Sequence, residues 1–500
     1  MIRIRCIGSD GVREMDSEEG IPLLTILGKN GYNVYSPCGG RGLCGKCTVW
    51  VSGTGKVLSC RYYPVSDIEV ILPGDDEAQI LARQTEFLED FQFRPEPSSF
   101  HSPSPYGVAV DLGTTTVALY FLNLIDGAIE KISTFLNPQM RFGADIISRI
   151  TWCQENDTGL RDLQTVVCAS INSELETFLT ERDLDTRDIE KIVVAGNTTM
   201  LHLLLGEDPV SIALAPFTPV FTERQVRRGV SSGLNINPDG QLITLPCLSA
   251  YVGADIIAGL AVLKPLYQNY LFVDIGTNGE IALVAGDTVY ACSAAAGPAF
   301  EGASLSCGMA AVRGAVSAYS DDGRITVIGN TEPEGICGSG IVDIVAYLLR
   351  KGIVDESGFL KDSFVVYPGN NIMITRQDIR EIQLAKSAIF SGIRILMKHA
   401  GIGFEDIEAL FLAGGIGNYI NIDSAIALGL LPSELKNRIF PVGNSAGIGA
   451  VQNLRSDEHE KRMLRILENS RYVELSDAQD FPEEFAVNMY FPGPSGVDIA

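Results

Sequence analysis

The chain has 500 residues, of which 46% are hydrophobic and 20% charged, and its formal net charge at pH 7 is −24. This length exceeds one ordinary hydrophobic core, so we expect two or three domains. The acidic balance argues against nucleic acids and anionic membrane surfaces as partners, because their phosphates require a basic protein surface.

The first residues, "MIRIRCIGSDGVREMD", alternate and carry charge where a secretory signal would have an apolar core. No apolar run reaches about 18 residues, so we expect no membrane span. Eleven cysteines, an odd number scattered over the chain, are not typical of a secreted disulfide framework. The sequence therefore predicts a cytoplasmic protein with reduced thiols.

Residues 1 to about 75 form a predicted β-rich unit. "MIRIRCIG", "KCTVWVSG" and "DIEVILPG" have the composition of strands, and "PLLTILGKNG" that of a helix that ends at glycine. From Asp75, the stretch "DDEAQILARQTEFLEDFQF" has apolar residues at helical spacing. We expect a helix there, between the β-rich unit and the rest of the chain.

A glycine-rich loop in this unit contains closely spaced cysteines, and a further cysteine follows it. The spacing is C-x5-C-x2-C-x12-C, formed by Cys38, Cys44, Cys47 and Cys60. Thiolates are strong ligands for iron and zinc, and glycines allow the backbone to turn tightly around a cluster. The pattern favours an iron–sulfur cluster. A zinc site, a 4Fe–4S cluster and four unliganded thiols are the alternatives, although the paired C-x2-C motifs of zinc sites and the C-x2-C-x2-C run are missing.

The stretch "RPEPSSFHSPSPYG", residues 94–107, contains four prolines and four serines. This composition predicts an extended connector, which could span on the order of 40 Å at about 3.3 Å per residue. It marks the clearest domain boundary in the chain.

Two later segments repeat one plan. "YGVAVDLGTTTVALYFLNLIDGAIEKIS" and "YLFVDIGTNGEIALVAGDTVYACS" each contain a strand that ends in Asp-x-Gly-Thr, followed by two more strands. The repeat aligns Asp111 with Asp274, and it predicts a duplicated α/β domain with a cleft between its halves. Other residues aligned by the repeat are Gly113 with Gly276 and Thr114 with Thr277.

A strand that ends in Asp-x-Gly-Thr and a tight turn suits a nucleotide phosphate. Glycine lets the backbone approach the phosphate, threonine hydroxyls donate hydrogen bonds, and the aspartate holds Mg²⁺ directly or through water. The candidate binding residues include Thr115 and Asn278, which complete the two loops, and the glycines of "ALFLAGGIGNYI", Gly414, Gly415 and Gly417. That stretch and "PVGNSAGIGAVQNL" are equally compatible with packing turns.

Residues 107 to about 450 resemble the actin-like ATPase superfamily, which has a duplicated α/β, ribonuclease H-like fold. The resemblance rests on residues 111–115 and 274–278 as phosphate loops, 413–417 as an adenosine loop and 443–449 as a connecting helix. It implies that Asp111 and Asp274 are catalytic. It also places Glu280 where some members orient the attacking water.

The order of a cysteine-rich domain, a linker and an actin-like ATPase resembles the reductive activators of corrinoid proteins, as do "VAGNTTMLHLLLG", "AAAGPAFEGA" and "GICGSGIVDIVAYLL". The resemblance implies ATP-dependent transfer of one electron from a 2Fe–2S cluster to a corrinoid, which returns Co(II) to Co(I). ATP and Mg²⁺ are then cofactors. A corrinoid-binding protein of a methyltransferase system and an external low-potential electron donor are then partners, and a homodimer is left open.

This resemblance gives a predicted domain organisation. Residues 1–75 form a β-grasp, ferredoxin-like α+β domain that binds the cluster through Cys38, Cys44, Cys47 and Cys60. Residues 76–106 form a helix and a flexible linker, and 107–500 form the ATPase, with lobes at about 107–265 and 266–500. The linker runs directly into the first phosphate loop, without the extra domain that some longer members have there.

Two other functions remain open at this point. One is a small-molecule kinase of the actin-like superfamily, regulated by a redox-sensing iron–sulfur domain. The other is an ATP-gated redox switch without enzymatic activity. Asn197, Thr198 and Thr199 are interpreted as a helix cap or as contacts to a nucleotide or partner, and the cysteines outside the loop as core residues.

Overall fold

The computed structural model describes residues 2–8, 11–30, 32, 34, 42, 47–52, 54–71, 86–94, 100–417 and 419–493. Cys38 and Cys44 lie outside these ranges, as does most of the helix that we expected from Asp75. In the described residues, no helix is long and apolar enough to cross a membrane.

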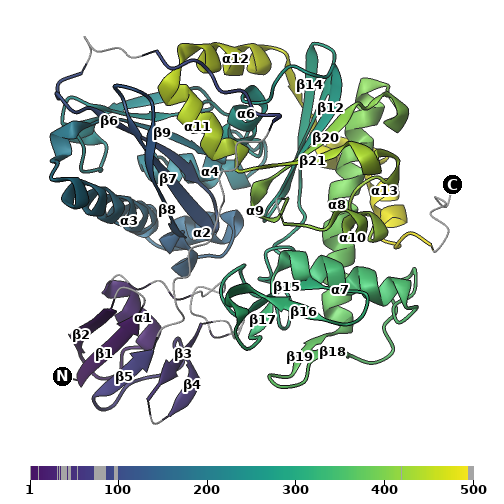
Figure 1. Ribbon diagram of the computed structural model, residues 1–500, viewed down its shortest axis with the longest axis horizontal. Helices are drawn as coiled ribbons and strands as arrows, with labels where there is room; N and C mark the ends of the chain where they lie inside the picture. The colour runs from purple at the N-terminus through teal and green to yellow at the C-terminus, as the bar shows by residue number, and fades with distance from the viewer. Residues whose placement is uncertain are drawn as a thin grey trace.

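The N-terminal unit is one five-stranded sheet with a helix on one face (Figure 1). The sheet order is β2-β1-β5-β3-β4, and β1 pairs with β5 in parallel while the other pairs are antiparallel. Alternate strand residues such as Ile4, Val49 and Val70 pack with Leu23 and Leu27 of the helix into a small core. The elements are β1 Ile2–Gly8, β2 Gly11–Ser17, α1 Leu23–Lys29, β3 Thr48–Val51, β4 Gly55–Leu58 and β5 Ile68–Ile71.

The first lobe contains a six-stranded sheet in the order β10-β11-β9-β6-β7-β8. Its central strand β6 is almost wholly buried because helices cover both faces, which explains its nearly continuous apolar sequence. The strands are β6 Tyr106–Leu112, β7 Thr116–Asn123, β8 Ile129–Leu136, β9 Ile189–Gly196, β10 Gln225–Arg228 and β11 Gln241–Thr244. The helices are α2 Ile146–Glu155, α3 Gly159–Arg182, α4 Thr198–Leu205, α5 Val210–Ala213 and α6 Ala254–Ala261.

The second lobe repeats this sheet as β21-β20-β12-β13-β14-β22. The strands are β12 Asn269–Ile275, β13 Gly279–Ala285, β14 Thr288–Ala294, β20 Ala409–Ala413, β21 Ile439–Gly443 and β22 Ser470–Tyr472. In both lobes the first three strands are antiparallel and a later strand, β9 or β20, pairs in parallel with the first. The predicted duplication of the α/β domain is therefore confirmed.

Helices and two small sheets complete the second lobe. The long helix α8 begins with a capping box between Thr375 and Asp378, ends at Gly401 with φ of 71°, and packs on β13 and β14. The other helices are α7 Gly338–Arg350, α8 Arg376–Ala400, α9 Gly414–Gly417, α10 Ile422–Ala427 and α13 Phe481–Asn488. The small sheets contain β15 Ala315–Tyr319, β16 Ile325–Val327, β17 Gly335–Ile336, β18 Phe364–Tyr367 and β19 Ile372–Ile374.

The division of the chain into lobes at residue 265 needs one correction. Helices α11 Ser445–Arg455 and α12 Asp457–Glu468 lie in sequence between β21 and β22 of the second sheet but pack on α6 and the first lobe (Figure 1). A Cβ added at Gly449 of α11 would lie 2.6 Å from the carbonyl oxygen of Ala258, so the two helices approach too closely for any larger residue. The small residues of "PVGNSAGIGAVQNL" thus serve close helix packing.

The predicted helix is wrong for its described part, residues 86–93, which contain turns and extended chain. Leu88 forms an isolated antiparallel bridge with Leu263, and Phe87 contacts the rings of Phe411 and Phe440. These apolar side chains are therefore buried against the ATPase lobes and not along one face of a helix.

The described end of the linker is also held in place. The backbone amides of His101 and Ser102 donate to Glu190 Oε1 at 2.6 and 2.8 Å. The expectation of a weakly structured connector is therefore wrong for this part of the segment.

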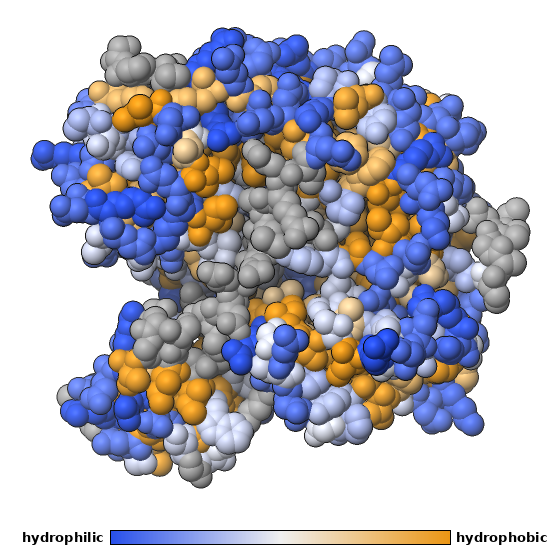
Figure 2. Space-filling view, in the orientation of Figure 1, coloured by the Kyte–Doolittle hydropathy of each residue, from blue (hydrophilic) through white to orange (hydrophobic). Residues whose placement is uncertain are grey.

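The N-terminal unit touches the first lobe through α1. Arg141, at the end of the 3-10 helix η2 Pro138–Arg141, donates to the carbonyl oxygen of Gly28 at 3.4 Å. Beside this contact, the space-filling view shows a notch between the unit and the first lobe (Figure 2).

Candidate nucleotide site between the two lobes

The two Asp-x-Gly-Thr sequences each form a tight turn at equivalent strand ends, and the hydrogen bond that closes the turn spans one residue fewer in the second loop. The amide of Gly113 donates to the carbonyl oxygen of Thr116 at 3.1 Å. The amide of Gly276 donates to the carbonyl oxygen of Asn278 at 2.9 Å. A Cβ at Gly113 would lie 2.6 Å from the Thr116 oxygen, whereas at Gly276 the nearest atom would be 3.7 Å away. Glycine is therefore required sterically in the first loop, and in the second loop it leaves the backbone open to a ligand.

Asn137 holds the first loop through two hydrogen bonds to its backbone carbonyl groups. Its backbone amide donates to the carbonyl oxygen of Thr115 and its side-chain amide to that of Gly113, both at 2.8 Å. Asn137 directly precedes η2 and caps it through Gln139. Since both bonds fix carbonyl groups, the remaining backbone amides and hydroxyls of the loop can face the cleft.

Arg149 supports the same loop with a buried charge. This arginine is 0% exposed, and its Nη2 donates to the carbonyl oxygen of Thr114 at 2.6 Å. Burial lowers the pKa of Arg149 to about 9, although Asp145 and Glu301 oppose the shift. Asn197, the N-cap of α4, donates to the Thr114 hydroxyl at 3.0 Å. Asn197 is thus both a helix cap and a loop contact, whereas Thr198 and Thr199 are buried in α4.

Asp111 and Asp274 lie at the ends of the equivalent strands β6 and β12, with Asp255 near both. Burial, followed by the charge of Asp255, raises the pKa of Asp111 to about 7, and a hydrogen bond from Asn444 opposes this shift. Burial together with Asp255, Asp111 and Glu301 raises the pKa of Asp274 to about 8. Like charges are thus concentrated in the cleft, which is the environment that a divalent cation neutralises.

Asp255 and Glu280 complete this group of acids. Asp255 lies in the first turn of α6, and burial raises its pKa to about 6. Glu280 is the strand partner of Asp274 on β13, and burial with the charges of Asp255 and Asp274 raises its pKa well above the ordinary value. Among the described residues, no three acids, thiols or imidazoles converge closely enough to hold a metal alone. A cation here would share its ligands between these acids and the phosphates.

Glu301 joins the two loops directly. Its Oε2 accepts a hydrogen bond from the Thr277 hydroxyl at 2.6 Å and one from the Thr115 hydroxyl at 3.2 Å. Burial raises the pKa of Glu301, while the two threonines and Arg149 act in the opposite direction.

The third predicted loop also reaches the cleft. Gly414 has a φ of +84°, and a Cβ added there would collide with Asp274 Oδ1. Gly415 faces open space, whereas Gly417 packs against Leu412. Of the three glycines, Gly414 and Gly415 are therefore placed to border a ligand, and Gly417 has a packing role.

The structure thus brings Asp111, Asp274 and Glu280 together with both phosphate loops and Gly414. The sequence reasoning missed several polar residues that contact this group: Asn137, Arg149, Asp255, Glu301 and Asn444. Asp255 had a detectable pattern, since "VGADIIAGL" has the small-residue helix start that was noted in "VGNSAGIGA". Glu301 and Asn444 lie within the quoted stretches "AAAGPAFEGA" and "PVGNSAGIGAVQNL", whereas Asn137 and Arg149 had no such pattern in the sequence.

The two described thiols of the predicted metal loop lie at one end of a hairpin. Cys47 directly precedes β3 and Cys60 follows β4, and the register pairs Thr48 with Leu58. Both cysteines are buried, with 1% and 7% exposure, and Ser59 donates to the carbonyl oxygen of Cys47. Two buried thiols on adjacent chain segments fit a metal cluster; Cys38 and Cys44 lie outside the described residues.

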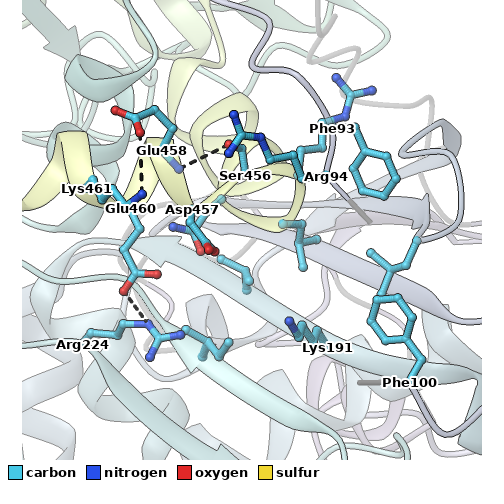
Figure 3. A pocket seen from close by; sticks show the side chains of 16 residues that line it. Phe93, Arg94, Phe100, Lys191, Arg224, Ser456, Asp457, Glu458, Glu460 and Lys461 are labelled. Carbon is cyan, nitrogen blue, oxygen red and sulfur yellow. Dashed lines mark hydrogen bonds and ion pairs between the residues drawn. The ribbon is translucent and has the colours of Figure 1, made fainter. Parts of the chain in front are cut away.

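A cavity of about 200 Å³ lies away from the cleft, between the linker and the start of α12 (Figure 3). Side chains of both signs surround it, among them Arg224 and Glu460, whose Nε and Oε1 are 3.3 Å apart. None of the predicted site residues contributes to its wall.

Two equivalent sheets, each with a phosphate-type loop facing a cleft lined by carboxylates, define an ATPase domain of the actin-like, ASKHA class. The family model described as "C-terminal domain of RACo the ASKHA domain" matches residues 268–496, and the "RACo middle region" model matches residues 106–267. The region that the family model calls middle is therefore the first lobe itself, which begins where the linker ends.

The chain belongs to the RACo family, as the sequence motifs predicted. It is 35% identical to the "Corrinoid activation enzyme RamQ" of Eubacterium limosum, over 79% of this chain and 72% of that protein. It is 26% identical to a "[Co(II) methylated amine-specific corrinoid protein] reductase" of Methanosarcina barkeri, over 68% of each chain. A solved "Reductive activator for corrinoid,iron-sulfur protein" matches 99% of both chains with 30% identity and a TM-score of 0.71.

Proposed function

We propose that this chain is an ATP-dependent reductive activator of a corrinoid protein. In this function, one electron returns the cobalt of an inactive Co(II) corrinoid to Co(I), and ATP hydrolysis drives the transfer. The observation that supports this proposal most strongly is that one chain contains both a cysteine-bearing β unit and a two-lobed ATPase domain. The likeness to a solved reductive activator over 99% of both chains supports the same conclusion.

We assign the nucleotide to the cleft between the lobes. The hydroxyls and amides of Thr114, Thr115, Thr277 and Asn278 would bind the phosphates, and Gly113 and Gly276 would allow their close approach. Mg²⁺ would be held by Asp111 and Asp274 with Asp255, partly through water. Gly414 and Gly415 would form the adenosine side of the site, and Gly417 would support this turn by packing on Leu412.

Among the acids of the cleft, Glu280 was expected to orient the attacking water. Its position opposite Asp274 supports a place near the reacting phosphate. Burial and the charges of Asp255 and Asp274 raise the pKa of Glu280. A bound Mg²⁺ would act in the opposite direction, because its positive charge favours the carboxylate form.

The N-terminal unit would be a β-grasp, ferredoxin-like domain that binds a 2Fe–2S cluster through Cys38, Cys44, Cys47 and Cys60. The first and last strands of the unit, β1 and β5, are neighbours in the sheet and pair in parallel, which supports this fold. The buried thiols of Cys47 and Cys60 support the ligand set. When bound, the cluster would supply the single electron that the corrinoid accepts.

We propose residues 1–75 as the cluster domain, 76–106 as the connection, and 107–265 and 266–500 as the lobes, with α11 and α12 crossing back to the first. The partners would be the corrinoid-binding protein of a methyltransferase system and an external low-potential electron donor, in the cytoplasm. A homodimer is compatible with this function but is not required by it.

ATP is needed if the electron donor is less reducing than the Co(II)/Co(I) couple. Each 100 mV of mismatch costs about 2.3 kcal/mol for one electron. The nucleotide can offset this cost only if its bound states engage the corrinoid protein differently. Movement of the two lobes around the phosphates would provide that difference.

An anaerobic cobalt assay tests this function. The reconstituted protein is mixed with a Co(II) corrinoid protein, a reductant, Mg²⁺ and ATP, and the Co(I) absorbance is followed. We expect Co(I) only with ATP, and none with Cys47→Ala or Asp274→Ala. Failure to form Co(I) with several corrinoid proteins, despite an intact cluster and bound ATP, would favour a kinase or an ATP-gated switch.

A further inference from the structure

Glu301 belongs to the segment "AAAGPAFEGA" and lies between the two phosphate loops. One carboxylate oxygen, Oε2, accepts hydrogen bonds from a hydroxyl of each loop, Thr115 at 3.2 Å and Thr277 at 2.6 Å. These hydroxyls come from opposite lobes and are 162 residues apart in the sequence. The contact therefore links the phosphate loops of the two lobes through one carboxylate oxygen.

The surroundings of this carboxylate are those that a phosphate oxygen requires. Two hydroxyls donate to it, and the buried cation of Arg149 attracts it. Arg149 makes its hydrogen bonds to backbone carbonyls, an amide oxygen and a thioether, and among the described residues it has no carboxylate in ion-pair contact. Its charge is thus available to an anion in the cleft.

We propose that Glu301 is an internal stand-in for the terminal phosphate of the nucleotide. In the nucleotide-free protein its carboxylate takes the two threonine hydroxyls, and the terminal phosphate of ATP displaces it. This inference rests on the proposed nucleotide site, and it adds a residue that sets the affinity for ATP relative to ADP.

The backbone around Glu301 is fixed, so the displacement is a rotation of its side chain. Phe300 is fully buried, and Gly338 at the start of α7 packs directly on its carbonyl oxygen. Gly302, with φ of +75°, is held against Met309 on the other side. The Glu301 side chain itself is only partly covered.

Competition of this kind lowers the apparent affinity for any ligand that needs the same donors. The observed dissociation constant equals the intrinsic one divided by the fraction of protein in which the site is free. ADP lacks the terminal phosphate and competes less. The carboxylate should therefore weaken ATP binding more than ADP binding.

The test is a calorimetric titration of the full-length protein with ATP and with ADP, with Mg²⁺ present and corrinoid protein absent. We expect Glu301→Gln to tighten ATP binding about tenfold, because a neutral acceptor holds the hydroxyls less strongly than an anion. ADP affinity should change less than about threefold by the same reasoning. Glu468→Gln, on the exposed end of α12, removes the same charge outside the cleft and should change neither.

Steady-state kinetics separates this role from one in the chemical step. The KM for ATP should fall in Glu301→Gln, and kcat should stay within about threefold of the wild-type value. Unchanged ATP affinity, or equal tightening of ATP and ADP, would overturn the inference. A loss of kcat of about a hundredfold without a change in affinity would overturn it too, since Glu301 would then act on the reaction.

The same titrations distinguish failure of the inference from failure of the proposed function. If the wild-type protein binds neither nucleotide, the proposed site itself is wrong. If it binds both but Glu301→Gln matches it, only the role of Glu301 is wrong. Melting temperatures of the variants confirm that each is folded, and Glu301→Ala, which removes both acceptor oxygens, should tighten ATP binding at least as much as Glu301→Gln.

Discussion

Asn444 donates its side-chain amide to Asp111 at 2.8 Å, across 333 residues of sequence. The same side chain caps α11, since its Oδ1 accepts from the amide of Gly447 at 2.7 Å. Helix α11, which follows β21 of the second sheet and packs on the first lobe, thus orients the acid of the first phosphate loop. Asp111 is fixed by an element from the C-terminal part of the chain, and relative movement of α11 would change its environment.

Replacement of Asn444 separates these two contacts. Asn444→Ser retains a capping oxygen but is too short to reach Asp111, whereas Asn444→Ala loses both. We expect Asn444→Ala to cost about 1 kcal/mol more stability than Asn444→Ser. ATP hydrolysis should fall at least about tenfold in both variants, because one hydrogen bond to a charged group is lost. Unfolding curves and steady-state hydrolysis measure these effects, and wild-type hydrolysis by Asn444→Ser would contradict the role of the Asp111 contact.

Asp255 raises the pKa of Asp111 and of Asp274, so its charge destabilises the empty cleft. We expect Asp255→Asn to raise the stability of the nucleotide-free protein by about 1 kcal/mol. Mg²⁺-dependent ATP hydrolysis should fall about a hundredfold or more. Asp287→Asn, in the exposed turn at the other end of β13, serves as the matched control and should change neither quantity. Lower stability of Asp255→Asn would contradict the charge argument.

The three partly buried aspartates predict how stability depends on pH. Their pKa values in the folded protein are about 6 for Asp255, about 7 for Asp111 and about 8 for Asp274, against 3.8 ordinarily. From about pH 4 to about pH 8 the folded state therefore binds more protons than the unfolded state. Stability should fall as the pH rises through this window, since protons favour the state that binds more of them.

Melting temperatures from pH 5.5 to 8.5 in a chelator, without nucleotide, measure this slope. We expect a fall of roughly 5 °C or more across the range. Asp255→Asn should show a shallower fall, and Mg²⁺ with ATP should reduce the slope because they bind the charged form of the cleft. A wild-type slope equal to that of Asp255→Asn would contradict the prediction.

The cysteines give a prediction for the N-terminal unit. Cys47→Ser and Cys60→Ser should remove the visible absorbance of the reconstituted cluster, because each replaces a buried thiol of the proposed ligand set. ATP binding should remain unchanged, since both residues lie outside the cleft. Cys153→Ser in the partly buried α2 is the control and should retain full absorbance. A complete cluster in Cys47→Ser would show that the ligand set is different.

Much of the architecture could be predicted from local sequence. Strand alternation, glycine-terminated helices and the repeated Asp-x-Gly-Thr turns depend on neighbouring residues, so the duplicated lobes and the positions of Asp111 and Asp274 followed directly. The cysteine spacing likewise marked the N-terminal unit. The strand ends and turns persist in the structure because each is set by backbone geometry within a few residues, whereas Cys38 and Cys44 lie outside the described residues.

The helix predicted from Asp75 is an element for which local sequence gave the wrong secondary structure. The apolar spacing at Phe87, Leu88 and Phe91 fits a helix, yet these side chains are buried separately, and Leu88 bridges to Leu263. Burial against distant residues outweighs the weak local preference for helix.

The remaining site residues were decided by tertiary structure. Asp255, Glu301, Arg149 and Asn444 come from different segments, and their local sequences do not show that their side chains meet. They gain their roles only because the lobes face each other and α11 crosses between them, where burial strengthens every charge interaction. The sequence alone determined the two phosphate loops and the predicted cysteine ligands, and only the packing of the lobes determined which carboxylates and amides surround those loops.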